Sequence, residues 1–180
     1  MMQREAQAVL QGSPHCPRVC GLVRFTDKDC GCVVQVKVNN LPSDGGCPPR
    51  IHGFHIHECG DCTPSRGCDP FPRAGLPFNP TCQPPGRRAG DLPPLLSSCG
   101  EAMATFYTGA FCVQDIQGRS VAVHMDSGGP CANPSGSAGQ MIACGVICPL
   151  NACECAEPTR PPRQPPCFPK SLWPAPRRDW

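Results

Sequence analysis

Hydrophobic and polar positions alternate along the chain in short runs, which is the pattern of β-strands rather than of helices. The best example is residues 31–39, where Val34, Val36 and Val38 share one face while Gln35 and Lys37 lie on the other. Side chains two apart in a strand point to the same side, so this run predicts a half-buried strand. Similar short runs predict strands at residues 5–11, 19–26, 51–58, 101–107, 110–116, 119–125 and 141–148.

The segments between these runs are rich in residues that form turns. The chain has 25 Pro and 19 Gly among 180 residues, and both types weaken or break helix interiors. From Cys59 to Leu96 nearly every stretch has turn chemistry, and a loop of that length inside a compact domain is either functional or disordered. We therefore predict an all-β antiparallel sandwich or barrel over residues 1–148. The density of proline in residues 149–180 predicts a disordered tail rich in Cys and Pro.

Charge and hydropathy argue against two classes of partner. Sixteen basic and fourteen acidic residues give a net charge of +2, which is too small for electrostatic binding of nucleic acid. No apolar run approaches the roughly 18 residues of a membrane-spanning helix. The first thirteen residues lack the apolar centre of a signal peptide, and an odd count of 17 Cys leaves at least one thiol unpaired in a monomer. We expect a cytoplasmic protein with mostly free cysteines and one or two disulfides.

Three of the five histidines lie within six residues, and their spacing indicates a metal site. His55 and His57 are two apart in a predicted strand, so their rings project from the same face. Such an H-x-H pair is a common ligand set for copper or zinc. His124 ends another predicted strand and could supply a third nitrogen. The alternative, that all three are ordinary strand residues, explains the pair and its third partner less well.

Five motifs, in order, resemble copper/zinc superoxide dismutase across about residues 7–148. They are HGFHIHECGDCT, RAGLPFNP, AGDLP, IQGRSVAVH and SAGQMIACGVI. The resemblance implies an eight-stranded Greek-key β-barrel with a long metal-binding loop. The copper-ligand positions that it implies are His55, His57 and His124. It also implies a structural role for His52 and a disulfide between Cys68 and Cys144 that pins the loop to the last strand.

The same resemblance implies that the zinc site has been lost. Pro77 stands where the family has a histidine that bridges the two metals, and Pro85 and Arg88 replace two zinc histidines. Asp91 is then the one zinc ligand that remains. Zinc takes about four nitrogen, oxygen or sulfur ligands, and proline offers none. We therefore expect no zinc, and copper bound weakly by three histidines.

The positions that support turnover are changed as well. Met141 stands where the family has an arginine that attracts superoxide, and Pro77 cannot release and rebind copper. We expect a catalytically inactive homologue that resembles the dismutase-like proteins of poxviruses. The function that this implies is protein binding, as a decoy for the copper chaperone of superoxide dismutase, in host cytoplasm and the virion. A homodimer or heterodimer through the barrel would fit that function.

Two other functions stay open. A weakly active copper-only dismutase would tolerate the loss of zinc. A copper-handling chaperone would use Cys153 and Cys155, since a C-x-C pair can hold Cu(I) through two thiolates and resembles the C-terminal motif of the copper chaperone. A second C-x-C at residues 30–32 shows that such pairs arise by chance in this composition. Cys59 and Cys62 form a C-x2-C pair that could replace zinc ligands, but no matching second pair is evident.

Overall fold

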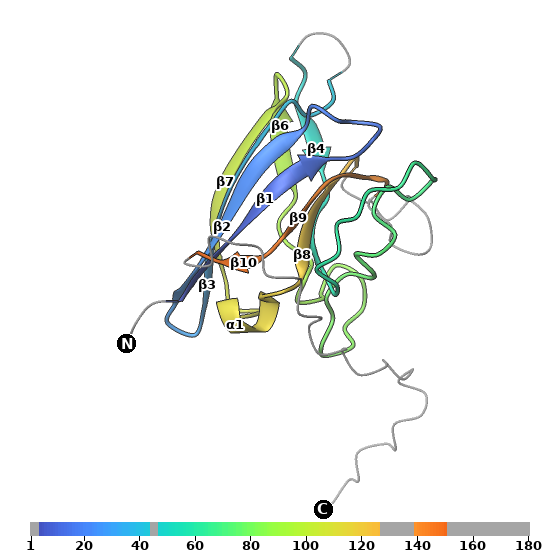
Figure 1. The fold of residues 1–180 in the computed structure, drawn as a ribbon. Helices are drawn as coiled ribbons and strands as arrows, with labels where there is room; N and C mark the ends of the chain where they lie inside the picture. The colour runs from blue at the N-terminus through green and yellow to red at the C-terminus, as the bar shows by residue number, and fades with distance from the viewer. Residues whose placement is uncertain (1–3, 44–46, 127–138, 151–180) are drawn as a thin grey trace, which may run out of the picture.

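A computed structural model describes residues 4–43, 47–126 and 139–150, which form one antiparallel sheet that curls into a barrel (Figure 1). The elements are β1 (Glu5–Gly12), β2 (Cys20–Lys28), β3 (Gly31–Asn39), β4 (Arg50–His52), β5 (Phe54–His57), β6 (Leu95–Ser98), β7 (Glu101–Thr108), α1 (Val113–Ile116), β8 (Ser120–His124), β9 (Met141–Val146) and β10 (Cys148–Pro149). The predicted all-β class is confirmed.

The barrel closes through β4 and β5. Neighbouring strands follow the order β4-β6-β7-β3-β2-β1-β9-β8-β5, so β4 and β5 form the two ends of the sheet. Gly53 alone separates these two strands in the sequence, and its backbone forms hydrogen bonds with the end of β8 and the residues after it. Its N–H donates to the carbonyl oxygen of Asp126 (2.9 Å), and its own carbonyl accepts the N–H of His124 (2.8 Å). Counted as one interrupted strand, β4 and β5 reduce the nine strands of this order to eight, which is the number that the family resemblance implies, while β10 pairs with β1 outside this order.

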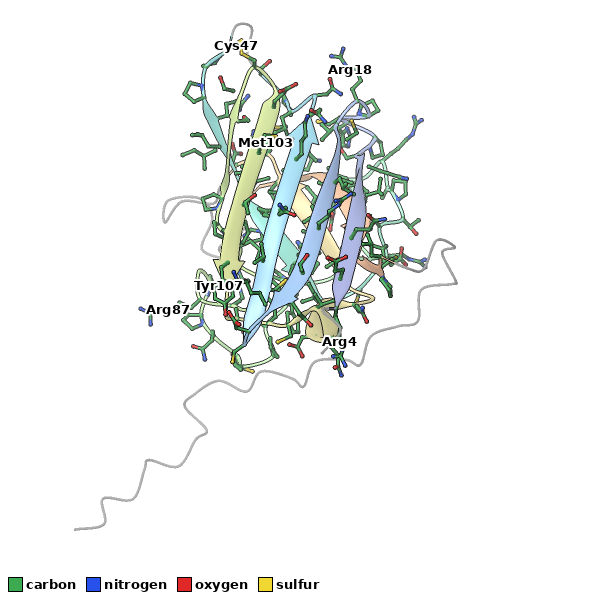
Figure 2. All side chains as sticks on the ribbon, turned by 90° about the vertical axis from the view of Figure 1, so that its left-hand side faces the viewer. Arg4, Arg18, Cys47, Arg87, Met103 and Tyr107 are labelled. Carbon is green, nitrogen blue, oxygen red and sulfur yellow. A yellow bond between two sulfur atoms is a disulfide. The ribbon has the colours of Figure 1, made fainter. Side chains whose placement is uncertain are left out.

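Alternate residues of the strands fill the interior. In β3, Val34, Val36 and Val38 are buried, whereas Gln35 and Lys37 are exposed. The predicted alternation of this strand is therefore confirmed. The outer face of β7, β3, β2 and β1 is turned toward the viewer in Figure 2.

The segment 110–116, predicted as a strand, contains the short helix α1 instead. The carboxylate of Asp115 accepts the backbone N–H of Cys112 (2.8 Å), and the carboxylate of Asp27 accepts that of Val113 (2.6 Å). These acceptors satisfy donors that a helix start leaves free. Val113 and Ile116 are both buried, and a spacing of three places them on one helix face. Because α1 has four residues, the described part of the chain contains no helix that could cross a membrane.

Strand β6 was not predicted from the sequence. It follows two prolines at the end of the turn-rich segment, and it is only four residues long. Leu95 is buried and Leu96 is exposed, so the alternation is present but brief. β6 pairs with β4, and a disulfide between Cys47 and Cys99 (Cα–Cα 4.1 Å) joins the segments next to the two strands. This disulfide was also not predicted.

Candidate metal site

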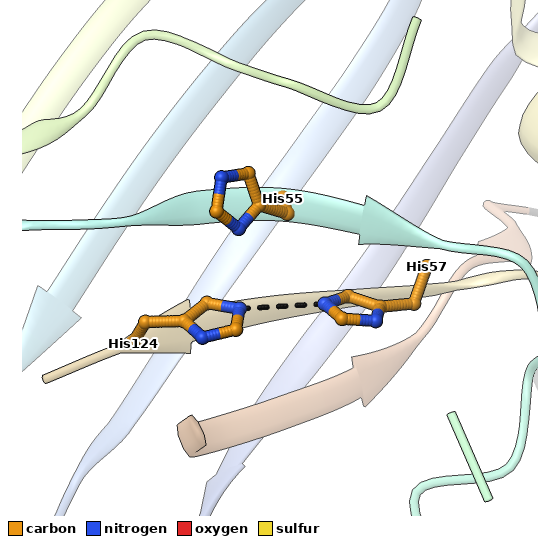
Figure 3. Close-up of side chains that lie close together, drawn as sticks. All are labelled: His55, His57 and His124. Atoms are coloured by element: carbon orange, nitrogen blue, oxygen red, sulfur yellow. Dashed lines mark hydrogen bonds between the residues drawn. The ribbon is translucent and has the colours of Figure 1, made fainter. Parts of the chain in front are cut away.

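Two adjacent strands carry the three histidines named from the sequence. His55 and His57 lie on β5, and His124 is the last residue of β8, which pairs with β5 in antiparallel register. All three rings lie together (Figure 3), and each can offer one nitrogen within 4.8 Å of the others. The structure therefore brings together the three predicted copper-ligand positions.

Backbone carbonyls set which nitrogen of His57 and His124 faces the site. His57 Nδ1 lies 2.8 Å from the carbonyl oxygen of Gly75, and His124 Nδ1 lies 3.0 Å from that of Gly139. A carbonyl oxygen only accepts, so both Nδ1 atoms carry the proton and both Nε2 atoms keep a lone pair. These two Nε2 atoms are 3.3 Å apart. Two lone pairs at that distance repel each other unless a cation lies between or beside them, so the arrangement suits a metal ion.

His55 supplies the third nitrogen. Its buried Nδ1 has no hydrogen-bond partner among the described residues, while its Nε2 lies 3.9 Å from Oδ1 of Asp91. A buried polar atom without a partner costs about 1–3 kcal/mol. A metal ligated by this nitrogen would remove that cost. Three imidazole nitrogens are a suitable ligand set for copper.

Burial keeps the three histidines neutral, which is the form that binds a metal. It lowers the pKa of His55 to about 4, with a smaller effect from the neighbouring His57. It also lowers the pKa of His124 to about 3, with smaller effects from His55 and His57, and it lowers the pKa of His57. At neutral pH, proton competition for these nitrogens is therefore weak.

The expected zinc positions lie beside this group but present one carboxylate. Pro77 forms an isolated bridge with His57, and Pro85 is exposed in a turn. Arg88 Nε lies 3.1 Å from both carboxylate oxygens of Asp91. The carboxylate of Asp91 is thus already paired with a positively charged side chain, that of Arg88. Among the described residues, the three histidines are the one group of three or more His, Cys, Asp or Glu side chains placed to share a metal. The absence of zinc stays a prediction.

The site opens into a pocket of about 520 Å³. Its lining comprises His55, His57, Cys68, Asp69, Pro70, Gly75, Leu76, Pro77, Arg88, His124, Gly139, Gln140 and Met141. Met141, at the expected anion-guiding position, contributes an uncharged and nearly buried side chain. The pocket wall is therefore formed by the long loop after β5 and by the start of β9.

The disulfide to the last strand is formed by a different cysteine from the one predicted. Cys144 bonds to Cys62, with Cα atoms 5.7 Å apart, whereas Cys68 is an exposed free thiol. Cys62 packs with Phe71 and Ala74 against Cys144, so the inner part of the loop faces β9. The predicted Cys68–Cys144 pairing is wrong, although the loop is pinned to β9 as expected. Because Cys62 is bridged, it cannot serve as a zinc ligand.

The structure describes one of the two C-x-C pairs. Cys153 and Cys155 lie outside the described residues. At the other pair, Cys30 is exposed and Cys32 is buried, so the two thiols do not share an accessible face.

The backbone carbonyls that orient His57 and His124 belong to the glycines of two motifs, RAGLPFNP and SAGQMIACGVI. The sequence marks these motifs, but it does not show which atoms contact the rings.

Comparisons with known proteins agree with these observations. The sequence profile of copper/zinc superoxide dismutase matches residues 19–147. A Cu-Zn superoxide dismutase of Paramecium bursaria Chlorella virus 1 is 34% identical over 158 residues, which cover 79% of this chain and 76% of the relative. A putative Cu-Zn superoxide dismutase of Orgyia pseudotsugata multicapsid polyhedrosis virus is 34% identical over 117 residues (56% and 74%). The Cu-Zn superoxide dismutase of Deinococcus radiodurans is 28% identical over 151 residues (74% and 80%).

The comparisons contradict the expectation that the chain is not an enzyme. The matched relatives carry the name of a dismutase, and the described residues retain a three-histidine group that fits copper. The earlier expectation treated each replaced residue as a loss. The three copper-ligand positions, in contrast, are all retained.

The family profile spans most of the barrel and both strands of the histidine site. The viral relative matches more than three quarters of the chain at 34% identity. The chain therefore belongs to the copper/zinc superoxide dismutase family.

Proposed function

We propose that the protein is a superoxide dismutase that works with copper alone. The observation that carries this proposal is the convergence of three neutral imidazoles, from His55, His57 and His124, beside an open pocket. Copper, when bound, would accept an electron from one superoxide ion and donate it to a second, so that two superoxide ions and two protons yield O₂ and H₂O₂. The remaining steps depend on residues of the chain.

The chain orients its ligands without a second metal. The carbonyl oxygens of Gly75 and Gly139 hold the Nδ1 protons of His57 and His124, which keeps both Nε2 atoms directed to one point. Pro77 has neither a side-chain donor nor a backbone N–H. Pro77 therefore cannot pass a proton to the substrate, and solvent that enters the pocket would supply both protons of the reaction. The pair of Arg88 and Asp91 supports the loop where the family would place zinc.

Superoxide consumption by the copper-loaded, zinc-free protein tests this proposal. We expect rapid decay of superoxide in stopped-flow measurements and at least a 100-fold loss of rate for His124→Ala. His15→Ala is the matched control, because His15 is an exposed histidine outside the site. A copper-loaded wild-type protein that is no faster than the copper-free protein would overturn the proposal.

The copper chaperone for superoxide dismutase is proposed as a binding partner, with the barrel surface as the region that it contacts. Family membership supports this partner, and capture of the chaperone would also withhold copper from other dismutases. A pull-down with purified chaperone tests it, using wild type and the Cys153→Ser/Cys155→Ser double variant. Equal retention supports recognition through the barrel, and loss in the double variant alone supports copper handling by the C-x-C pair. No retention of wild type would exclude the partner.

We propose that the protein works in the cytoplasm, because several of its thiols are free. For a viral chain, this would be the cytoplasm of the infected host. Several described cysteines are free and exposed, including Cys20, Cys30 and Cys68. Reducing compartments keep such thiols unpaired. Fractionation of expressing cells, with detection of the full chain, would place it in the cytosol; recovery from the secreted fraction would contradict this.

A further inference from the structure

Arg88 occupies an unusual position for a cation. Its side chain is 14% exposed, and it lines the same pocket as His55, His57 and His124. Among the described residues that line this pocket, Arg88 is the one Lys or Arg. Met141, which also lines the pocket, carries no charge. A small anion that enters the pocket therefore meets a single permanent positive charge close to the histidines.

Asp91 holds the guanidinium by one edge and leaves the other edge available. Both carboxylate oxygens lie 3.1 Å from Nε of Arg88, and Oδ2 also accepts the backbone N–H groups of Gly86 and Arg88. No described residue accepts a hydrogen bond from the two terminal nitrogens of Arg88. A guanidinium fixed through Nε can still donate from its terminal N–H groups to an anion.

Asp91 links Arg88 to the histidine group. Asp91 Oδ1 lies 3.1 Å from Arg88 Nε and 3.9 Å from His55 Nε2, so one carboxylate oxygen contacts both side chains. Asp69 also lines the pocket, but it is an exposed residue. Solvent screens an exposed charge more strongly than one that is mostly buried.

We propose that Arg88 is the residue that attracts and binds small monoanions, superoxide among them, in the pocket beside the three histidines. The inference rests on the proposed function, because it names the residue that guides the substrate of that site. The positive charge comes from the loop before β6 and not from position 141 on β9. In this arrangement Asp91 is a positioning residue, since it aims the guanidinium.

Azide binding to the Cu(II)-loaded protein tests this role without turnover. Azide is a small monoanion, and its binding is followed by the visible and electron paramagnetic resonance spectra of the copper. We expect the dissociation constant for azide to rise at least about tenfold in Arg88→Gln, since a charge-assisted hydrogen bond is lost. The salt dependence of azide binding should also become weaker in this variant.

Arg87→Gln is the matched control, because it removes the same charge one position away. Arg87 is exposed and projects from the molecule in Figure 2. We expect its azide affinity to equal that of wild type. Equal azide affinity in Arg88→Gln and Arg87→Gln, with copper content unchanged, would overturn the proposal.

A purely structural role of Arg88 predicts a different result. If Arg88 only ties the loop, Arg88→Gln should lower the melting temperature and copper content without a specific change in azide affinity or in its salt dependence. Arg88→Lys keeps the charge and should retain most of the azide affinity; loss equal to that of Arg88→Gln would count against the proposal. A wild type without dismutase activity but with Arg88-dependent azide binding would refute the proposed function and leave this inference standing.

Discussion

His52 connects the metal-site strand to the rest of the barrel through hydrogen bonds at both ring nitrogens. Nδ1 donates to the carbonyl oxygen of His124 (3.1 Å), so Nε2 accepts from the hydroxyl of Ser97 (3.0 Å). The ring is fully buried, and burial lowers its pKa. His52 thus positions the backbone of a ligand without facing the pocket, which agrees with the structural role that the family resemblance implied.

Replacing His52 by Ala should destabilise the protein. The change removes two buried hydrogen bonds and leaves a cavity, so we expect the free energy of unfolding to fall by about 2–4 kcal/mol. Urea denaturation of the copper-free protein measures this loss. His15→Ala alters an exposed histidine and should change the free energy by no more than about 0.5 kcal/mol. Similar values for the two variants would contradict this role of His52.

Cys32 should be far less reactive than Cys30, two residues earlier. Burial raises the pKa of the Cys32 thiol to about 11, with smaller upward effects from Asp27 and Cys112. A raised pKa keeps the group as a thiol below that pH, and the thiolate is the reactive form. Iodoacetamide labelling of the native protein at pH 7–9, followed by peptide mass spectrometry, should modify Cys30 well before Cys32. Equal labelling rates would contradict the burial of Cys32.

Residue types and spacing were enough to predict which histidines meet, but not how each one faces the site. The H-x-H pair places two rings on one side of a strand, whatever the surrounding fold. The choice of Nδ1 or Nε2 depends on the carbonyls of Gly75 and Gly139, which come from distant segments. The partner of Asp91 could likewise not be predicted, because the substitution at Arg88 indicates a lost ligand until the contact is seen.

At the scale of elements, the long loop between β5 and β6 is fixed at several points. The N–H of Cys59 donates to the carbonyl of Ala74 (3.0 Å), and that of Phe78 donates to the carbonyl of Ile56 (2.8 Å). The Cys62–Cys144 disulfide joins the same loop to β9 across 82 residues of sequence. These contacts hold the pocket wall in place through residues of the chain itself.

Cys62→Ser should therefore cost stability, whereas Cys68→Ser should not. Opening a disulfide that spans this many residues should lower the free energy of unfolding by about 2–4 kcal/mol. Cys68 is exposed and free, so its replacement should change the value by no more than about 0.5 kcal/mol. Denaturant unfolding of both variants under non-reducing conditions measures the difference. A larger loss for Cys68→Ser would instead support the pairing first predicted.

Strand prediction succeeded where alternation continues for many residues and failed where tertiary contacts decide. β3 repeats its pattern over nine residues, and its observed bounds equal the predicted ones. β6 has four residues, too few for alternation to stand out after a turn-rich segment. The segment of α1 has buried Val113 and Ile116, which could belong to either element type, and the acceptor from distant Asp27 favours the helical start.

At the scale of the whole molecule, the barrel and its pinned loop keep the copper positions together even though zinc-ligand positions are changed. The family profile covers residues 19–147, and the closure at Gly53 brings β5 beside β8. The sequence could show this fold because its motifs occur in order along the chain. It could not show the ion pair of Arg88 and Asp91, which depends on contacts between residues of one folded loop. The incorrect expectation of an inactive protein gave weight to the replaced positions and too little to the retained histidine group.

Metal titration should then give one bound copper ion per chain and a gain in stability. At free copper 1,000-fold above the dissociation constant, binding to the native state adds about 4 kcal/mol to the free energy of unfolding. For a chain of this size, that gain should raise the melting temperature by about 8–16 °C. His124→Ala should lose most of this shift, since it removes one of three ligands, while His15→Ala should retain it.

Zinc added after copper should produce no second step in the titration. Asp91 is already paired with Arg88, and Pro77 and Pro85 offer no donor atoms. Elemental analysis of the dialysed protein supplies the stoichiometry, and a zinc content near one per chain in addition to copper would show that a second metal site exists after all.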